Sequence, residues 1–186
     1  MNSGHSTLFE PSHSFPEPLA ERVRVLQDGI RETGAPVDLA LPLATSGTHV
    51  VCWLHHAIRA HENPALDVAR LAAATLGLPL IVYQGLGGRH RFNSDRHHTF
   101  ILEGALEFAN ELSVLDPNIR FVFNLQRDPA APSPLSQLCA RAALIVTEDF
   151  PAPPFPQWTK HLAARCGRPI WLVDSACVVP MRLVVG

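Results

Sequence analysis

The sequence predicts one α/β domain with three layers, in which a five-stranded parallel sheet carries helices on both faces. Three observations lead to this prediction. Short apolar runs rich in β-branched residues alternate with longer segments of helical periodicity, as in repeated β-α-β units. The runs show little polar alternation, which is typical of strands covered on both faces. The chain has 186 residues, of which 47% are hydrophobic and 17% charged, and this suits a single domain with a sizeable core.

The N-terminal segments precede the predicted sheet. Residues 1–17 are polar and proline-bearing, and we expect a disordered leader rather than a signal peptide, because no basic stretch precedes an apolar one. The domain is expected to span residues 18–186. Apolar residues at spacings of four, three and four predict a helix that starts at Pro18 and ends at Gly34, before Pro36. Its apolar stripe consists of Leu19, Val23, Leu26 and Ile30.

The predicted strands are five apolar runs separated by helical segments. They occupy residues 49–54, 79–84, 119–125, 143–147 and 169–173. Because the helices between them imply right-handed crossovers, the fold is expected to be Rossmann-like.

Each predicted helix has recognisable start and stop signals. Asn63 can cap the first, with Pro64 at its first position and Gly77 at its end. The second runs from about residue 95 to residue 115, a short third follows Ser133, and a fourth is closed by Gly167. The expected apolar faces are Leu66, Ala69, Ala73 and Leu76 in the first helix, Leu102, Ala105, Leu106, Ala109 and Leu112 in the second, and Trp158, Leu162 and Cys166 in the fourth.

Ligands of open parallel sheets bind beyond the carboxyl ends of the strands. This rule directs attention to four loops, which start at His55, Gln84, Gln126 and Glu148. Glu148 and its neighbour Asp149 could hold a ribose or a ring N–H, or could cap the loop that follows them.

Two of these loops have compositions that suggest ligands. His55, His56 and His61 lie close together, as in some metal sites, but adjacent side chains on an extended chain point apart and no cysteine is near, so solvated histidines are the simpler interpretation and no metal site is predicted. The glycine-rich residues 85–88 could approach a phosphate. They do not match the dinucleotide fingerprint, so a tight turn is the simpler interpretation.

Charge and cysteine content exclude several classes. The formal net charge is −2, which does not indicate a strongly basic nucleic-acid binder. No apolar run reaches the length of a membrane span. The four cysteines are far apart, without a C-x-x-C pair, and buried free thiols in a reducing cytoplasm are expected. No nucleophile motif is present, and no catalytic residue is predicted.

Four stretches distributed over residues 49–186 resemble the photolyase/cryptochrome family. Residues 49–66 read HVVCWLHHAIRAHENPAL, in which a strand, a Trp and a short basic loop precede R-x-H-[DE]-N-P-A-L. LGLPLIVYQGL at 76–86 resembles the second strand of the family, and RHHTFILEGALEFANEL at 96–112 resembles the helix after it. LVDSACVVPMRL at 172–183 resembles the V-D-x-x-x-[IV]-V-P segment of the class II branch. The first loop departs from the family, which usually has R-D or R-D-x-R where this chain has HHAIR.

The resemblance implies a function for the chain. It would be the N-terminal α/β antenna domain of a class II-like CPD photolyase, a flavoprotein lyase, or of a related cryptochrome photoreceptor. Such a domain can hold an antenna chromophore, a deazaflavin or a folate, and the expected binding residues are Trp53, His55, Gln84 and Leu86. FAD and the DNA-binding groove would belong to a helical partner domain outside this chain, which alone would be inactive in pyrimidine-dimer repair.

Two alternatives remain open from the sequence. One is a stand-alone nucleotide-binding α/β protein of the universal-stress or electron-transfer-flavoprotein type. The other is an interaction module without a ligand. A bound adenine nucleotide would favour the first of these.

Overall fold

The computed structural model describes residues 17–27, 31–33, 46–87, 94–128 and 130–184. The expected disordered leader lies outside these residues, except for Glu17, which begins the short helix α1 (Glu17–Ala20). In the described part of the chain, no helix is both long enough and apolar enough to cross a membrane.

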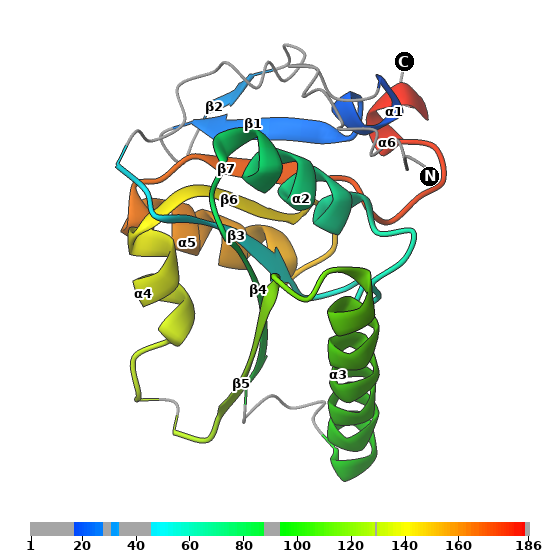
Figure 1. The fold of residues 1–186 in the computed structure, drawn as a ribbon, viewed down its shortest axis with the longest axis vertical. Coiled ribbons are helices and arrows are strands. Elements are labelled where there is room, and N and C mark those ends of the chain that lie inside the picture. The colour runs from blue at the N-terminus through cyan, green and yellow to red at the C-terminus, as the bar shows by residue number, and fades with distance from the viewer. Residues whose placement is uncertain (1–16, 28–30, 34–45, 88–93, 129, 185–186) are drawn as a thin grey trace, which may run out of the picture.

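A seven-stranded sheet forms the centre of the domain, in the order β2-β1-β7-β6-β3-β4-β5 (Figure 1). The neighbours from β7 to β5 pair in parallel, which confirms the five predicted strands and their direction. These strands are β3 (His49–Leu54), β4 (Leu80–Gly87), β5 (Arg120–Gln126), β6 (Ala142–Glu148) and β7 (Ile170–Val173).

Helices cover both faces of the sheet, so the predicted three layers are present. On one face, α2 (Pro64–Leu76) and α3 (Asp95–Leu115) pack in a core cluster with β3 and β4. On the other face, α4 (Pro134–Ala140) and α5 (Phe155–Cys166) form the second cluster. A last short helix, α6 (Met181–Val184), follows β7. Figure 1 shows α2 and α5 on opposite sides of the central strands.

The predicted N-terminal helix is wrong. Val23 to Gln27 form β1, which pairs antiparallel with β7, and Arg31 to Thr33 form β2. Val23 and Val25 enter one core cluster and Leu26 the other, so the segment contributes to both faces as a strand does. The spacing of four, three and four fits a helix, but Val23 and Val25 also alternate as in a strand. The edge of β7 supplies the backbone partners that favour the strand. Ile30, Gly34 and Pro36 lie outside the described residues.

The range predicted for α3 is confirmed, but its predicted apolar stripe is right only at Ala105 and Leu112. Leu102 is 42% exposed and Leu106 is 66% exposed. The buried residues are Ala105, Phe108 and Leu112. Phe108 packs edge-on against Phe121 of the edge strand β5, with ring centroids 5.0 Å apart, so the contact face of the helix is set by this aromatic pair.

Asn63 joins the start of α2 to the loop that precedes it. As predicted, its side chain caps the helix, accepting the backbone N–H of Leu66 at 3.2 Å. The same side chain donates through Nδ2 to the carbonyls of Ala57 and Arg59, at 2.9 and 3.0 Å. Asn63 is completely buried. It therefore determines the path of the loop as well as the start of the helix.

Replacing Asn63 should destabilise the protein more than replacing a solvent-exposed cap residue would. Asn63→Ala is expected to lower the free energy of unfolding by about 3 kcal/mol, since the cap is lost and the buried carbonyl of Ala57 and the partly buried carbonyl of Arg59 lose a donor. Asn63→Asp keeps a cap acceptor but cannot donate to the carbonyls, so it should also destabilise. Urea denaturation measures both. Wild-type stability of Asn63→Asp would show that the loop bonds contribute nothing.

Candidate functional site

The candidate site is a cavity of about 460 Å³ between the carboxyl ends of the central strands and helices α4 and α5. Its position agrees with the rule that parallel sheets bind ligands at this edge. The strands contribute Trp53, His55 after β3, Tyr83, Gly85, Leu86, Gly87, Asn124 and Gln126, and the helical side contributes Ser133, Leu135, Ser136, Trp158, His161, Leu162 and Arg165.

Three of the four residues predicted for this site line the cavity. Trp53, His55 and Leu86 do so, whereas Gln84 does not. Trp53 is paired in register with Tyr83, and Gln84 is paired with Leu54, so strand alternation places Gln84 on the opposite face of the sheet. There it is buried, and its Oε1 has no hydrogen-bond partner among the described residues. Tyr83 takes the place that we had expected for Gln84.

The glycines after Tyr83 lie in a strand and not in a tight turn, so that interpretation is wrong for residues 85–87. β4 continues to Gly87, and both Gly85 and Gly87 line the cavity. A Cβ atom built on Gly87 would meet no heavy atom within 4 Å. The absence of side chains at these positions leaves part of the cavity open. Gly88 lies outside the described residues.

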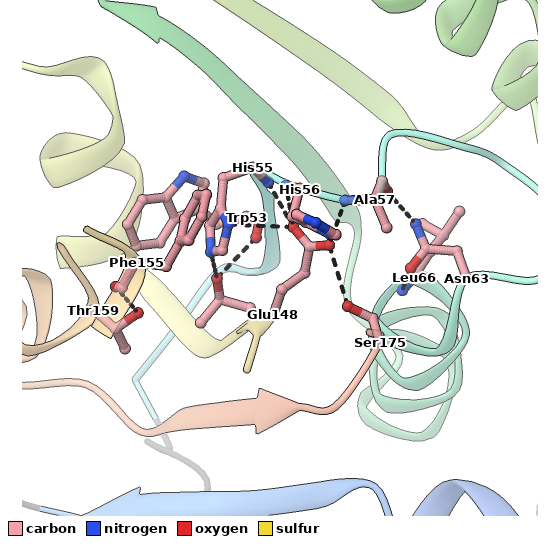
Figure 2. Close-up of polar contacts among 11 residues, drawn as sticks. Trp53, His55, His56, Ala57, Asn63, Leu66, Glu148, Phe155, Thr159 and Ser175 are labelled. Atoms are coloured by element: carbon pink, nitrogen blue, oxygen red, sulfur yellow. Dashed lines mark hydrogen bonds and ion pairs between the residues drawn. The ribbon is translucent and has the colours of Figure 1, made fainter. Parts of the chain in front are cut away.

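The buried carboxylate of Glu148 holds the loop that follows β3 (Figure 2). Its Oε2 accepts the backbone N–H groups of His55 and His56, both at 2.7 Å. Its Oε1 accepts the N–H of Ala57 at 2.6 Å and the hydroxyl of Ser175 at 3.2 Å. Three successive N–H groups thus converge on one anion, as in a backbone nest.

These bonds correct the roles that we had considered for the acids at the end of β6. Glu148 has its acceptor sites occupied by the loop after β3 and by Ser175, rather than by the loop that follows it. Asp149 accepts a hydrogen bond from Nε of Arg24 at 2.8 Å, which ties β6 to the antiparallel strand β1. Both acids therefore have structural partners.

The histidines of the first loop are directed into separate aromatic contacts. His55 stacks on Phe155 with ring centroids 4.7 Å apart, and His56 stacks on Phe150 at 4.1 Å. His61 is exposed. In the part of the chain that the structure describes, no group of three or more His, Cys, Asp or Glu residues could hold a metal ion.

The His55 ring is buried between the cavity and Glu148. Thr147 donates its hydroxyl proton to the carbonyl of Trp53 at 2.9 Å. The Thr147 hydroxyl oxygen also lies 3.4 Å from Nε2 of His55. Because the hydroxyl proton is already used, Nε2 must carry the hydrogen in the contact between His55 and Thr147. Nδ1 lies 3.5 Å from Oε2 of Glu148 and makes no hydrogen bond among the described residues. Burial lowers the pKa of His55, although the charge of Glu148 opposes this change. The neutral ring is therefore the favoured form.

The cysteines are free. Cys52 and Cys139 are buried as expected, whereas Cys166 is half-buried and Cys177 is exposed. Burial raises the pKa of the Cys52 and Cys139 thiols. Neither has the depressed pKa of an activated nucleophile.

Removing the negative charge of Glu148 should loosen the loop after β3. Glu148→Gln replaces one acceptor oxygen by a donor that faces N–H groups, and should lower the free energy of unfolding by about 3 kcal/mol. Ser175→Ala, which removes one of the four bonds, should cost about 1 kcal/mol. Chemical denaturation compares the two. An equal loss in both variants would contradict the central role of the carboxylate.

His55 should make the stability of the protein fall on acidification. Its folded pKa lies below the unfolded value of 6.5, so below that pH the unfolded chain binds more protons and the folded state loses stability. His55→Phe retains a ring against Phe155 and cannot titrate. Urea denaturation from pH 8 to pH 5 should show a steeper loss in the wild type than in this variant. Parallel curves would refute the prediction.

Comparison with known proteins relates the chain to one enzyme family. No protein-family model matches the chain. Over 136 residues it is 31% identical to a deoxyribodipyrimidine photo-lyase of Methanothermobacter thermautotrophicus. The match covers 73% of this chain and 29% of that protein, so the chain matches less than a third of the length of this curated relative.

Solved structures with partial similarity have low sequence identity. The cytoplasmic domain of a prokaryotic cation chloride cotransporter is 14% identical with a TM-score of 0.45, and the match covers 73% of this chain and 50% of that one. A universal stress protein from Archaeoglobus fulgidus is 10% identical with a TM-score of 0.43, over 73% and 48% of the two chains. A universal stress protein in complex with cAMP is 12% identical with a TM-score of 0.44, over 71% and 100%. The sequence match to the photo-lyase is therefore the similarity that bears on the family of this chain.

Proposed function

We propose that this chain is the α/β antenna domain of a class II-like photolyase and that its cavity binds a flat chromophore, a deazaflavin or a folate. The domain would support light-driven repair of pyrimidine dimers by a larger protein. The 31% identity to a photo-lyase over 73% of this chain supports the family. The position and the lining of the cavity support the binding of a flat ring.

The observation that carries the proposal is the aromatic lining of the cavity. Trp53 and Tyr83 lie on the sheet side, and Trp158 of α5 lies on the helical side. Aromatic faces on two sides suit a flat conjugated ring. Amide and hydroxyl groups of Asn124, Gln126 and Ser133 also line the cavity. Asn124 and Ser133 already bond to the Tyr83 hydroxyl, and Gln126 Nε2 donates to two backbone carbonyls, so the ring edge would use their remaining donors and acceptors. A volume of about 460 Å³ lies within the range of cofactor sites.

The class II assignment relies on the segment after β7, which has a defined structure here. Asp174 accepts the backbone N–H groups of Ala176 and Met181, at 3.2 and 2.7 Å. The guanidinium of Arg22 donates to the carbonyls of Asp174, Cys177 and Val178. The aspartate of the V-D-x-x-x-V-V-P motif thus organises the turn before α6, which gives the motif a physical reason in this chain.

In this proposal the photochemistry belongs to a partner domain. Repair needs FAD beside a dimer flipped out of the DNA duplex, and a basic surface that binds phosphates. The net charge of −2 gives this chain little attraction for DNA. The chain supplies the chromophore cavity, and the helical domain would supply FAD and the DNA groove.

A cavity-filling substitution tests the proposal without removing any packed group. The deazaflavin and the folate should quench the fluorescence of Trp53 and Trp158, with a dissociation constant below about 1 mM for at least one of them. Gly87→Leu places a side chain where a Cβ atom meets nothing within 4 Å, and it should weaken binding at least about tenfold.

Gly104→Leu is the matched control, because a Cβ on this α3 residue also meets nothing within 4 Å and the residue does not line the cavity. It should bind as the wild type does. Failure of both chromophores to bind would refute the proposal. Binding of AMP in their place would favour a stand-alone nucleotide-binding protein.

A further inference from the structure

The cavity has one guanidinium and one imidazole on its helical side. His161 and Arg165 of α5 both line it, with Trp158 and Leu162. The spacing of these four residues puts them on one face of the helix. Acidic residues outnumber Lys and Arg in the whole chain, 17 to 15, yet no Asp or Glu is among the described residues that line the cavity. The lining is therefore biased toward positive charge.

Arg165 and the aromatic rings lie toward different ends of the cavity. Trp158 lies next to the His55 ring, with centroids 6.4 Å apart. Arg165 follows Trp158 by two helical turns, which is roughly 10 Å along the axis of α5. Behind His55 lies the carboxylate of Glu148, 3.5 Å from Nδ1. The aromatic end thus has a negative charge behind it, and the other end has Arg165.

We infer that the ligand of this cavity carries a phosphate group, with its flat ring near Trp53 and Trp158 and the phosphate at Arg165 and His161. This inference rests on the proposed function, since it requires a ring in the same cavity. A guanidinium can bind a phosphate through two parallel hydrogen bonds. The charge of Glu148 disfavours the reverse orientation, because it would bring two anions together.

A pair of probes that differ only in the phosphate tests this inference. FMN should bind the full chain at least about tenfold more tightly than riboflavin at low salt, as followed by flavin fluorescence. The preference should shrink as salt screens the exposed guanidinium of Arg165. Arg165→Gln should reduce it to about twofold or less and leave the affinity for riboflavin unchanged, because the ring contacts remain.

Two further variants separate this contact from general charge and from misfolding. Lys160→Gln removes an exposed positive charge from α5 at a residue that does not line the cavity, and it should keep the preference for FMN. Arg165→Lys keeps the charge but not the planar fork, so it should retain part of the preference.

Each outcome distinguishes the phosphate site from the ring site. Equal binding of FMN and riboflavin would overturn the phosphate site and leave the chromophore proposal intact. An equal loss of preference in Lys160→Gln and Arg165→Gln would also overturn it, since the effect would be one of net charge. If no flavin, deazaflavin or folate binds, the ring site and the phosphate site both fail.

Discussion

The burial of one carboxylate organises the functional edge of this domain. Glu148 is 1% exposed, and a carboxylate at that depth is stable only if hydrogen-bond donors replace its water. Three backbone N–H groups and the Ser175 hydroxyl provide this replacement. The donors come from the ends of β3 and β7, which flank β6 in the sheet. One side chain therefore joins the carboxyl ends of three adjacent strands.

This arrangement gives a physical reason why the first loop can depart from the photolyase pattern. Glu148 binds the loop through main-chain N–H groups, which any residue except proline supplies. The side chains at positions 55 and 56 are therefore not needed to hold the loop. In this chain they are histidines, which stack on Phe155 and Phe150. The loop is held in this way without the Arg-Asp pair of the photolyase pattern. Asn63 holds the same segment from its other side, through the carbonyls of Ala57 and Arg59.

The sequence predicted the parallel strands and the capped helices well because their signals are local. Asn63 followed by Pro64 and the glycines that end α2 and α5 act within a few residues. β1 was missed because its identity depends on the edge of β7, more than 140 residues later in the chain. The site was predicted in part: proximity to strand ends found Trp53, His55 and Leu86, but it also suggested Gln84, whose side chain lies on the other face of the sheet from Tyr83. The sequence around α5 predicts a helix, but its spacing does not show which face of the helix lines the cavity. The cavity residues Trp158, His161 and Arg165 could therefore not be predicted.

The cavity and the core use the same strands for different purposes. β4 is buried at Val82 and Tyr83 but ends in residues without side chains at Gly85 and Gly87. Glycine weakens a strand, because it packs nothing and loses more conformational freedom on folding. Neither glycine has a positive φ, and the position of Gly87 has room for a side chain. Backbone geometry therefore does not require glycine at position 87. These glycines instead leave an open volume beside Tyr83. A flat ring would need such a space, between aromatic side chains at the edge of a parallel sheet where ligands bind.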